Sequence, residues 1–376
     1  MTEISIQKVV NYYQRRRFVS FPWQIYQDDP LWVPPLLHER ITHLDPRKGT
    51  FFSHGQADFF LAYRDGKLCG TIMAAADHSS NASRGLQDGM FGFFECIDDQ
   101  AVADMLFSAA EGWIKSHGLH RMIGPFNQDY DSAYGLLIEG RDRPPAVGCG
   151  HTPPYYEKLI VNQGFKPLRP DNLAFELDIS QNTQEFELLH QLARKAADRG
   201  MAVIRTGRFD EWDREADRVH FLLNKALAHL DDFVGWDRHA LDDTLAPFKK
   251  YADPDLVLFA DVDDQTVGFF PGIPNLNEIL HHLNGLRYPW DVFKYLRYGH
   301  AQPNGLAIKS VLVLPEYWGT GISLMLFSEM LKRAQAKGYT WVDLSLTSVD
   351  NPKTPALAQR IGAKIYKRYR VYQKRL

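Results

Sequence analysis

The 376-residue chain has few cysteines, no excess of basic residues and no long apolar run. Its three cysteines, Cys69, Cys96 and Cys149, are odd in number and widely spaced, which is typical of reduced thiols rather than a disulfide framework. The formal net charge is −3 at pH 7, so the composition gives no basic footprint for nucleic acid. Apolar runs such as LVLFA are far shorter than the ~20 residues that span a bilayer.

The sequence also lacks metal-binding motifs and a secretory signal. The sequence has no CxxC or HxxxH cluster, so no metal is expected. The N-terminal stretch MTEISIQKVVNYYQRRRFVSFPW lacks the apolar core of a secretory signal. We therefore expect a cytoplasmic protein without a transmembrane segment, for which contact with a membrane surface stays open.

The remaining composition is that of an ordinary folded protein, with 45% hydrophobic and 24% charged residues. The length favours two domains of roughly 150–200 residues. Aromatic residues make up 13% of the chain and are densest in residues 18–36 and 284–300. They either pack in the core and between domains or line an apolar substrate channel.

Two segments about 210 residues apart predict the same order of elements. Residues 59–76 and 256–270 each read as a β-hairpin, with turns at Asp65-Gly66 and at Asp263-Asp264. A strand follows each hairpin (90–97 and 306–314). Next come a helix of about four turns that ends at a glycine, a further strand, a short helix and a closing strand. We therefore predict an α/β fold with domains at 1–180 and 181–376 and a helical insertion at 271–304.

The stretch LPEYWGTGISLML, residues 314–326, places two glycines between an apolar strand and a helix. The N–H groups at the beginning of a helix have no intrahelical acceptor, and the helix dipole adds about half a positive charge there. Glycines let phosphate oxygens approach the backbone closely. Residues 319–323 are therefore suited to bind a pyrophosphate.

This strand, glycine turn and helix resemble the signature of the GNAT superfamily of acyl-CoA-dependent N-acyltransferases, Gln/Arg-x-x-Gly-x-Gly/Ala. One register begins at Trp318, which replaces Gln/Arg, and a second begins at Glu316. The resemblance implies two tandem GNAT-like domains, each a mixed, mostly antiparallel twisted sheet flanked by helices. It also implies acetyl-CoA or a longer acyl-CoA as co-substrate, held by Leu314, Trp318, Gly319, Thr320, Gly321, Ile322, Ser323 and Asn351.

The first half has the same element order but an acidic loop, FFECIDD, where the glycines stand in the second half. Glu95, Asp98 and Asp99 would repel a pyrophosphate, so the first half is expected to be a degenerate copy that does not bind CoA. Motifs such as FFECIDD, GPFN and PPYYEKL resemble a bacterial group of tandem GNAT-like proteins. The layout is also similar to that of bacterial N-acyltransferases of long-chain amines, including those of ceramide-synthase type.

The resemblance implies direct attack of an amine on the thioester, which needs an oxyanion donor and a proton acceptor. Backbone N–H groups around 312–314 would supply the first. The family's usual acid and tyrosine are missing, with Ala358 and Ile160 at the two tyrosine positions. The catalytic candidates that remain are Glu95, Asp343 and Tyr156.

Each catalytic candidate also has a structural interpretation. Asp343 alternates with apolar residues, as a solvated strand residue does. Glu95 lies in an apolar strand, where a carboxylate is costly unless it is paired, so it is either salt-bridged or a site acid. Tyr156, like Tyr155, Tyr366 and Tyr369, is either an acid or a packing residue, and Ser345 neighbours Asp343 on the same strand.

The sequence thus predicts an N-acyltransferase that acts on a primary amine, with a long-chain or lipid-like acceptor as one option. The alternative is a non-catalytic acyl-CoA-binding or interaction protein, which the missing family residues favour. A third class, aminoacyl transfer from tRNA, has the neutral-to-acidic charge against it.

Overall fold

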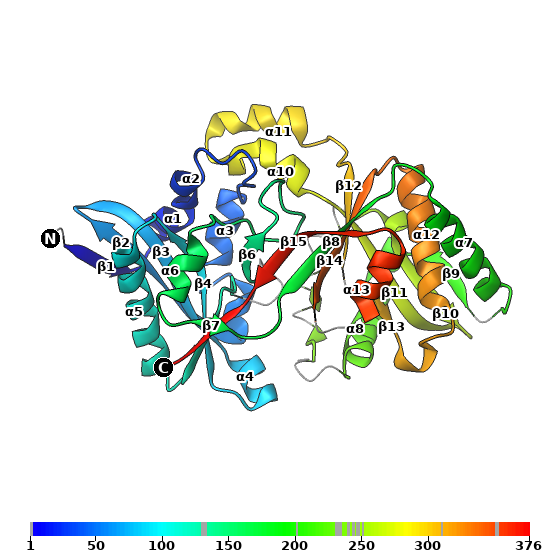
Figure 1. Ribbon diagram of the computed structural model, residues 1–376, viewed down its shortest axis with the longest axis horizontal. Helices are drawn as coiled ribbons and strands as arrows, with labels where there is room; N and C mark the ends of the chain where they lie inside the picture. The colour runs from blue at the N-terminus through cyan, green and yellow to red at the C-terminus, as the bar shows by residue number, and fades with distance from the viewer. Residues whose placement is uncertain are drawn as a thin grey trace.

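The computed structural model describes residues 3–128, 134–200, 202–229, 252–309, 311–349 and 353–376, together with 235–238, 241–242, 245 and 249. Figure 1 shows two lobes side by side, each built on its own β-sheet. The last strands of the chain run from the second lobe back into the first, where the C-terminus lies.

The first sheet has the strand order β1-β2-β3-β4-β5-β16-β7. Its neighbours are antiparallel except β4 and β5, which are parallel. The strands are β1 (Ile4–Lys8), β2 (Gly55–Arg64), β3 (Lys67–Asp77), β4 (Asp88–Cys96), β5 (Arg121–Gly124), β7 (Lys166–Pro167) and β16 (Tyr372–Arg375).

The second sheet has the order β6-β15-β8-β14-β12-β11-β10-β9, and β13 pairs with β11 beside this path. Its one parallel pair among the described strands is β12 with β14. The strands are β6 (Leu136–Glu139), β8 (Asn172–Asp178), β9 (Val203–Thr206), β10 (Val257–Val262), β11 (Gln265–Pro274), β12 (Gly305–Ile308), β13 (Leu312–Val313), β14 (Trp341–Ser348) and β15 (Lys364–Arg370). Both sheets are therefore mixed and mostly antiparallel, as predicted.

Helices flank both sheets (Figure 1). In the first lobe they are α1 (Tyr12–Ser20), α2 (Pro22–Ile25), α3 (Leu37–His43), α4 (His78–Arg84), α5 (Gln100–Ser116) and α6 (Tyr156–Val161). In the second they are α7 (Gln184–Ala197), α8 (Trp212–Ala226), α10 (Asn277–Leu283), α11 (Val292–Tyr298), α12 (Ile322–Ala336) and α13 (Lys353–Arg360). The repeated element order of the two halves is thus present in three dimensions.

Both predicted hairpins are present, and their turns have the backbone that a tight hairpin requires. The φ angles are +50° and +74° at Asp65 and Gly66, and +46° and +62° at Asp263 and Asp264. Two consecutive positive φ values match the right-handed twist of the flanking strands. These turns set the register of β2 with β3 and of β10 with β11.

The closing strands of the two halves are exchanged between the sheets. Strand β8 comes from the first half but lies between β15 and β14 in the second sheet, while β16 lies between β5 and β7 in the first. Apolar alternation shows that a segment is a half-buried strand but not which sheet receives it. The predicted domain boundary at residue 180 stays a prediction. The exchanged strands connect the two lobes.

The second half carries the expected helical insertion, which begins later than predicted because residues 271–274 still belong to β11. Its helix α10 and the turn that follows lie close to the N-terminal segment of the first lobe, and α11 packs on α10 (Figure 1). Trp23 Nε1 donates to Asn284 Oδ1 at 3.0 Å, and His281 Nε2 lies 2.6 Å from the carbonyl oxygen of Pro30. The insertion therefore bridges the lobes.

Candidate active site

The second sheet splits next to its parallel strand pair. Gly305, Leu306 and Ala307 of β12 pair with residues 341–343 of β14. Beyond this point the chain moves away to form β13, which pairs with β11, while β14 continues along β8. The two strands thus leave a gap between them after Ala307 and Asp343, and the residues around this gap form the candidate active site.

The glycine loop lies between β13 and α12 and is open to solvent. Gly319 and Gly321 have φ angles of +78° and +97°, which other residues rarely adopt. Gly321 caps α12 without a side-chain hydrogen bond. Among the residues that the structure describes, none accepts a hydrogen bond from the N–H groups of Gly319, Gly321, Ile322 or Ser323. The N–H of Thr320 makes only a long contact of 3.4 Å to the carbonyl oxygen of Tyr317. The loop therefore presents unpaired donors at a helix N-terminus.

Two residues that the resemblance assigned to the cofactor have other partners. The N–H of Leu314 donates to the carbonyl oxygen of Val267 at 2.9 Å, so it is not free for an oxyanion. Because hydrogen-bonded positions alternate along antiparallel strands, the N–H of Val313 instead points toward the gap beside β14. The indole N–H of Trp318 donates to the carbonyl oxygen of Val313 at 2.9 Å, so Trp318 braces the loop. Asn351 lies outside the described residues.

In the first half, the corresponding places are already filled. The side chain of Asp99 caps α5 by accepting from the N–H of Val102 at 3.2 Å, so a carboxylate stands where a phosphate would lie. The described strands β4 and β5 of the first sheet leave no such gap between them. Gly92 of β4 packs directly on the backbone after β5, so that a Cβ at Gly92 would lie 1.7 Å from the carbonyl oxygen of Phe126. The N–H of Phe93 is taken by Asn127 Oδ1 at 2.7 Å. These contacts agree with the expected loss of CoA binding in this half.

Asp343 is the central acid at the gap, and its interpretation as a solvated strand residue is wrong because its exposed fraction is 0%. Tyr366 donates its hydroxyl to Asp343 Oδ2 at 2.6 Å, and the N–H of Ser345 donates to Oδ1 at 3.0 Å. Ser345 has a φ angle of +63° at a bulge in β14, which turns this N–H back to the carboxylate. The alternating apolar pattern did not predict the burial of Asp343, because both faces of β14 are covered at this residue.

Lys309 completes this cluster and was not predicted. Its Nζ lies 3.5 Å from Asp343 Oδ1 and 3.5 Å from Ser345 Oγ. Burial would lower the pKa of Lys309, but the charge of Asp343 outweighs it and the pKa is raised. The side chain therefore stays cationic at the gap. The sequence did carry a signal for this pair, because Lys309 is the one charged residue of the apolar segment AIKSVLVL. An unpaired buried cation is costly, so a lysine in such a segment indicates an acidic partner.

A cavity of about 670 Å³ opens beside this cluster, which we call the apolar cavity. Lys309 and Ser345 line it on the side of the gap. Its walls are mostly apolar side chains of α8, β10 and β11, and include Phe209, Trp212, Val219, Leu223, Phe259 and Phe269. Its size and mostly apolar walls suit a long hydrocarbon group, and its charged lining residues are Arg169, Glu215 and Lys309.

Glu95 and Tyr156 lie together at a second cavity, of about 370 Å³, which we call the first-half cavity. Tyr156 donates its hydroxyl to Glu95 Oε2 at 2.7 Å. Burial raises the pKa of Glu95 to about 7, although hydrogen bonds from Tyr156 and Tyr26 favour its ionised form. No cation among the described residues pairs with Glu95, so the salt-bridge interpretation is not supported. Burial keeps the pKa of Tyr156 well above its usual range, so it remains a donor.

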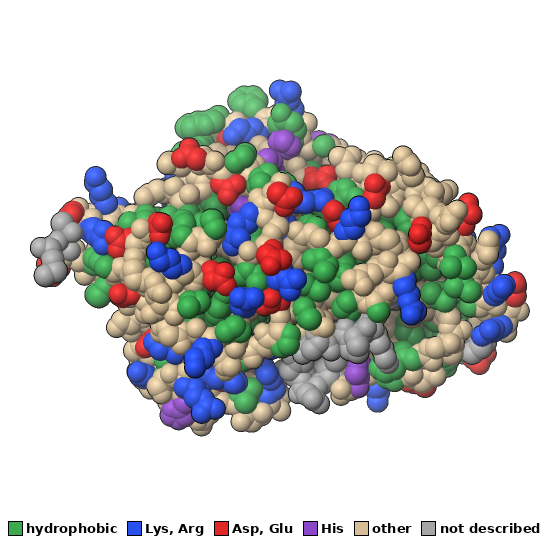
Figure 2. All heavy atoms as spheres, in the orientation of Figure 1, with side chains coloured by type: hydrophobic (Ala, Val, Ile, Leu, Met, Phe, Trp, Pro, Cys, Tyr) green, Lys and Arg blue, Asp and Glu red, His purple; other side chains and the backbone are tan. Residues whose placement is uncertain are grey.

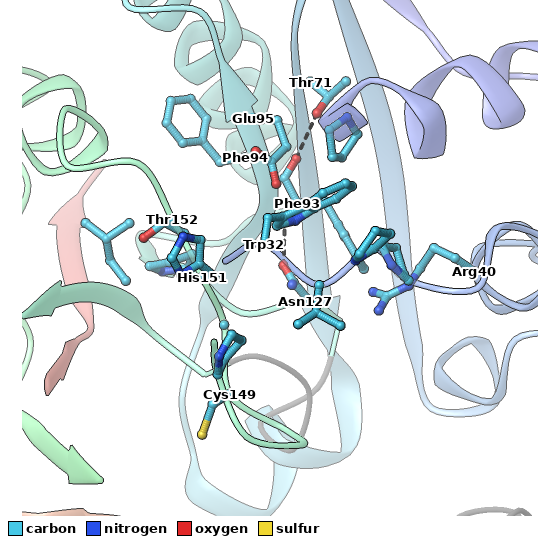
Figure 3. A pocket seen from close by; sticks show the side chains of 18 of the residues that line it. Trp32, Arg40, Thr71, Phe93, Phe94, Glu95, Asn127, Cys149, His151 and Thr152 are labelled. Atoms are coloured by element: carbon cyan, nitrogen blue, oxygen red, sulfur yellow. Dashed lines mark hydrogen bonds between the residues drawn. The ribbon is translucent and has the colours of Figure 1, made fainter. Parts of the chain in front are cut away.

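Figure 3 shows the first-half cavity, with Phe93 and Glu95 on one strand and the segment carrying Cys149, His151 and Thr152 nearby. His151 Nε2 lies 2.7 Å from Asp29 Oδ2. Burial lowers the pKa of His151, which favours its neutral form despite the aspartate. Gly148 lines both this cavity and the apolar cavity, so the two adjoin at that residue.

The remaining tyrosines are structural. Tyr155 donates to the carbonyl oxygen of Cys96 at 2.8 Å, and Tyr369 donates to that of Gly150 at 2.9 Å. Of the three catalytic candidates, Glu95 and Tyr156 therefore share one site, while Asp343 stands at the gap with Lys309. Among the described residues, no group of three or more His, Cys, Asp or Glu side chains could hold a metal ion.

Comparison with known proteins identifies the family. A model of the Acetyltransferase (GNAT) family matches residues 222–363, which include the glycine loop and β14. A protein named bacterial ceramide synthase from Caulobacter vibrioides is 30% identical over 383 residues, covering 100% of this chain and 98% of that protein. The chain belongs to the GNAT family. Protein YghO of Escherichia coli is 31% identical, over 99% of this chain and 95% of that protein.

The GNAT fold extends over both halves. A tandem GNAT protein from the clavulanic acid biosynthesis pathway superposes with a TM-score of 0.61, covering 99% of this chain and 98% of its own. At 11% identity this likeness concerns the fold alone. None of the helices in the described ranges has the length and apolar content to cross a membrane.

Proposed function

We propose that this chain transfers an acyl group from acyl-CoA to the primary amine of a long-chain, lipid-like molecule. The observation that carries the proposal is the Lys309–Asp343 pair, which stands at the strand gap and at one end of the apolar cavity. A reactive polar end joined to an apolar chamber suits a substrate with one polar group and a long chain. Membership of the GNAT family supports acyl-CoA as the acyl donor. The relative named bacterial ceramide synthase supports a lipid-like acceptor.

The cofactor would be held along the open side of the second sheet. The unpaired N–H groups of residues 319–323 would bind its diphosphate, aided by the dipole of α12. The thioester arm would enter the gap between β13 and β14. There the N–H of Val313 and the ammonium of Lys309 would face the carbonyl oxygen and stabilise the negative charge that develops on it.

Asp343 would act as a positioning residue, because it is fully buried and points at Lys309 rather than at a cavity. Its contacts with Tyr366 and the N–H of Ser345 fix the carboxylate, which in turn fixes Lys309. Charge held in place before the reaction stabilises a transition state more than charge that must reorganise.

Glu95 would receive the amine, which enters through the first-half cavity. An alkylammonium ion must lose a proton before its nitrogen can attack, and a carboxylate with a pKa of about 7 both attracts the cation and accepts that proton. The nitrogen then forms a bond to the carbonyl carbon. The carbon–sulfur bond breaks, the extra proton on the nitrogen passes to the departing sulfur, and CoA leaves as the thiol.

Purified protein incubated with palmitoyl-CoA and a panel of long-chain and short-chain amines tests this proposal. The expected result is release of free CoA thiol together with an amide product, at a higher kcat/KM for the long-chain amines. Saturable binding of palmitoyl-CoA without thiol release across the panel would favour the alternative, a non-catalytic acyl-CoA-binding protein. Absence of binding to CoA and palmitoyl-CoA would contradict both.

A further inference from the structure

The insertion in the second half exposes a contiguous set of large apolar side chains. Phe293, Leu296 and Trp290 have exposed fractions of 71%, 64% and 62%. Four more residues of the same segment are 38–48% exposed, namely Leu286, Tyr288, Val292 and Tyr295. We call these seven residues the apolar patch. In Figure 2 hydrophobic and basic side chains lie together at the top of the molecule, over α11 of Figure 1.

The helix α11 directs its apolar side chains outward in one arc. At about 100° per residue, Val292, Phe293 and Leu296 fall within roughly 100° of each other around the axis. Tyr298 points to the other side, where its ring stacks on His282 with centroids 4.6 Å apart. The helix is therefore held to α10 on one face and leaves the apolar arc uncovered.

Basic side chains border the patch, while its one acid is hidden. Arg297 lies on α11 beside the apolar arc and Arg287 precedes it, while Lys294 Nζ pairs with Asp291 Oδ1 at 3.0 Å. Asp291 is only 1% exposed and is bonded to the N–H of Tyr288 at 3.0 Å. The border of the patch is thus positively charged, which complements an anionic surface.

The patch is held firmly by the first lobe. A Cβ on Gly285, whose φ is +65°, would lie 2.4 Å from the carbonyl oxygen of Pro35, so the turn before the patch touches the N-terminal segment. Trp23 bonds to Asn284, and the guanidinium of Arg287 lies 5.4 Å from the centre of the Trp23 ring. The patch therefore has a fixed shape before it meets a partner.

We infer that the apolar patch docks on the surface of an anionic lipid bilayer. Trp and Tyr side chains with flanking Lys and Arg are the composition that favours the interface between headgroups and acyl chains. Seven side chains on one short segment are far fewer than the roughly 20–30 residues that each partner contributes to a stable protein interface. The occupant is therefore a membrane rather than a second copy of the chain.

Docking would also place the first-half cavity beside the bilayer, because Asn277 and Leu280 of α10 line that cavity. A long-chain amine dissolved in the membrane would then reach the cavity without crossing water. This consequence rests on the proposed function, whereas the docking itself does not.

Sedimentation with vesicles tests the inference. Vesicles of phosphatidylglycerol and phosphatidylcholine in equal parts are compared with pure phosphatidylcholine. Wild type should bind the anionic vesicles more tightly, and added salt should weaken that binding. The double variant Phe293→Asp/Leu296→Asp should bind about tenfold more weakly. The matched control is Leu188→Asp/Leu192→Asp on α7, which changes two side chains that are 55% and 41% exposed and should bind like wild type.

Equal binding by the patch variant and the control, or no binding by wild type, would overturn the inference. So would a wild-type dimer in sedimentation equilibrium that the patch variant abolishes, because a second copy would then cover the patch. Acyl transfer to a water-soluble amine is measured in parallel. If transfer persists without vesicle binding, the docking inference fails while the proposed function stands.

Discussion

The Nζ atom of Lys309 lies 3.5 Å from Oδ1 of Asp343, across the point where β12 and β14 part. The aspartate is fully buried, so the pair joins the core of the second sheet to the apolar cavity. In the proposed reaction this pair holds a cation near the carbonyl oxygen of the thioester.

Replacing Lys309 by Met should lower kcat by about 10²–10³-fold and change the affinity for CoA little, because the cation acts on the transition state. The variant also leaves Asp343 buried without its cation, which costs stability. The double variant Lys309→Met/Asp343→Asn should recover much of that stability while remaining inactive. Steady-state kinetics and thermal unfolding separate the two effects. Lys364→Met, at an exposed site on β15, is the control, and equal activity of all variants would refute the role of the pair.

The sequence predicted the fold class and the order of elements, but not this pair or the sheet that each closing strand joins. The turns at Asp65 and Asp263, the glycine loop and the helix periods are local signals, and each formed where it was expected. The Lys309–Asp343 contact joins the residue just after β12 to a residue of β14, and alternation within a strand cannot place the two against each other. The same limit hid the exchange of β8 and β16 between sheets, since strand pairing over long sequence separation leaves no local pattern.

A negative charge at the N-terminus of α12 should raise the stability of the helix but weaken the binding of CoA. Ser323→Asp should stabilise the helix by about 0.3–1 kcal/mol through the dipole. It should weaken CoA binding at least about tenfold, because it places a carboxylate near the diphosphate, as Asp99 does in the first half. Calorimetry with CoA and thermal unfolding measure the two effects. Ser323→Ala removes the hydroxyl without adding charge and should bind CoA nearly as wild type does. Unchanged affinity in the Asp variant would mean that the diphosphate binds elsewhere.

The raised pKa of Glu95, about 7, predicts that kcat/KM rises with pH through that value. Glu95→Gln should lower the activity and remove this inflection. Tyr155→Phe, next to the site, should leave the inflection in place. A pH profile of kcat/KM from pH 5.5 to 9 makes the comparison, and an inflection that survives in Glu95→Gln would assign it to another group.

Glu95 also predicts a pH-dependent stability, and the sign follows from proton binding. Its pKa is higher in the folded state than in the unfolded state, so the folded protein binds more protons between about pH 4.5 and 7. The free energy of unfolding should therefore fall as pH rises through this window. Glu95→Gln should be more stable than wild type by about 1–3 kcal/mol at pH 8 and nearly equal to it at pH 4.5. Denaturant unfolding at the two pH values checks this, and an equal difference at both would contradict the raised pKa.

Filling the apolar cavity should change chain-length preference. Leu346 lines the cavity and is partly buried on β14, so Leu346→Trp would occupy space next to Ser345. The kcat/KM for long-chain substrates should fall about tenfold or more relative to short ones, because the added ring excludes the chain. Competition assays with acyl-CoA and amine series of different length measure the shift. An unchanged preference in both series would show that the cavity does not hold the substrate chain.

The central claim is that the unpaired N–H groups around Thr320 bind the diphosphate of CoA. A crystal structure of the protein with bound CoA tests this most directly. The account predicts diphosphate oxygens about 2.7–3.2 Å from the backbone nitrogens of Gly319, Gly321, Ile322 or Ser323. Diphosphate density at any other place, such as the N-terminus of α5, would contradict it.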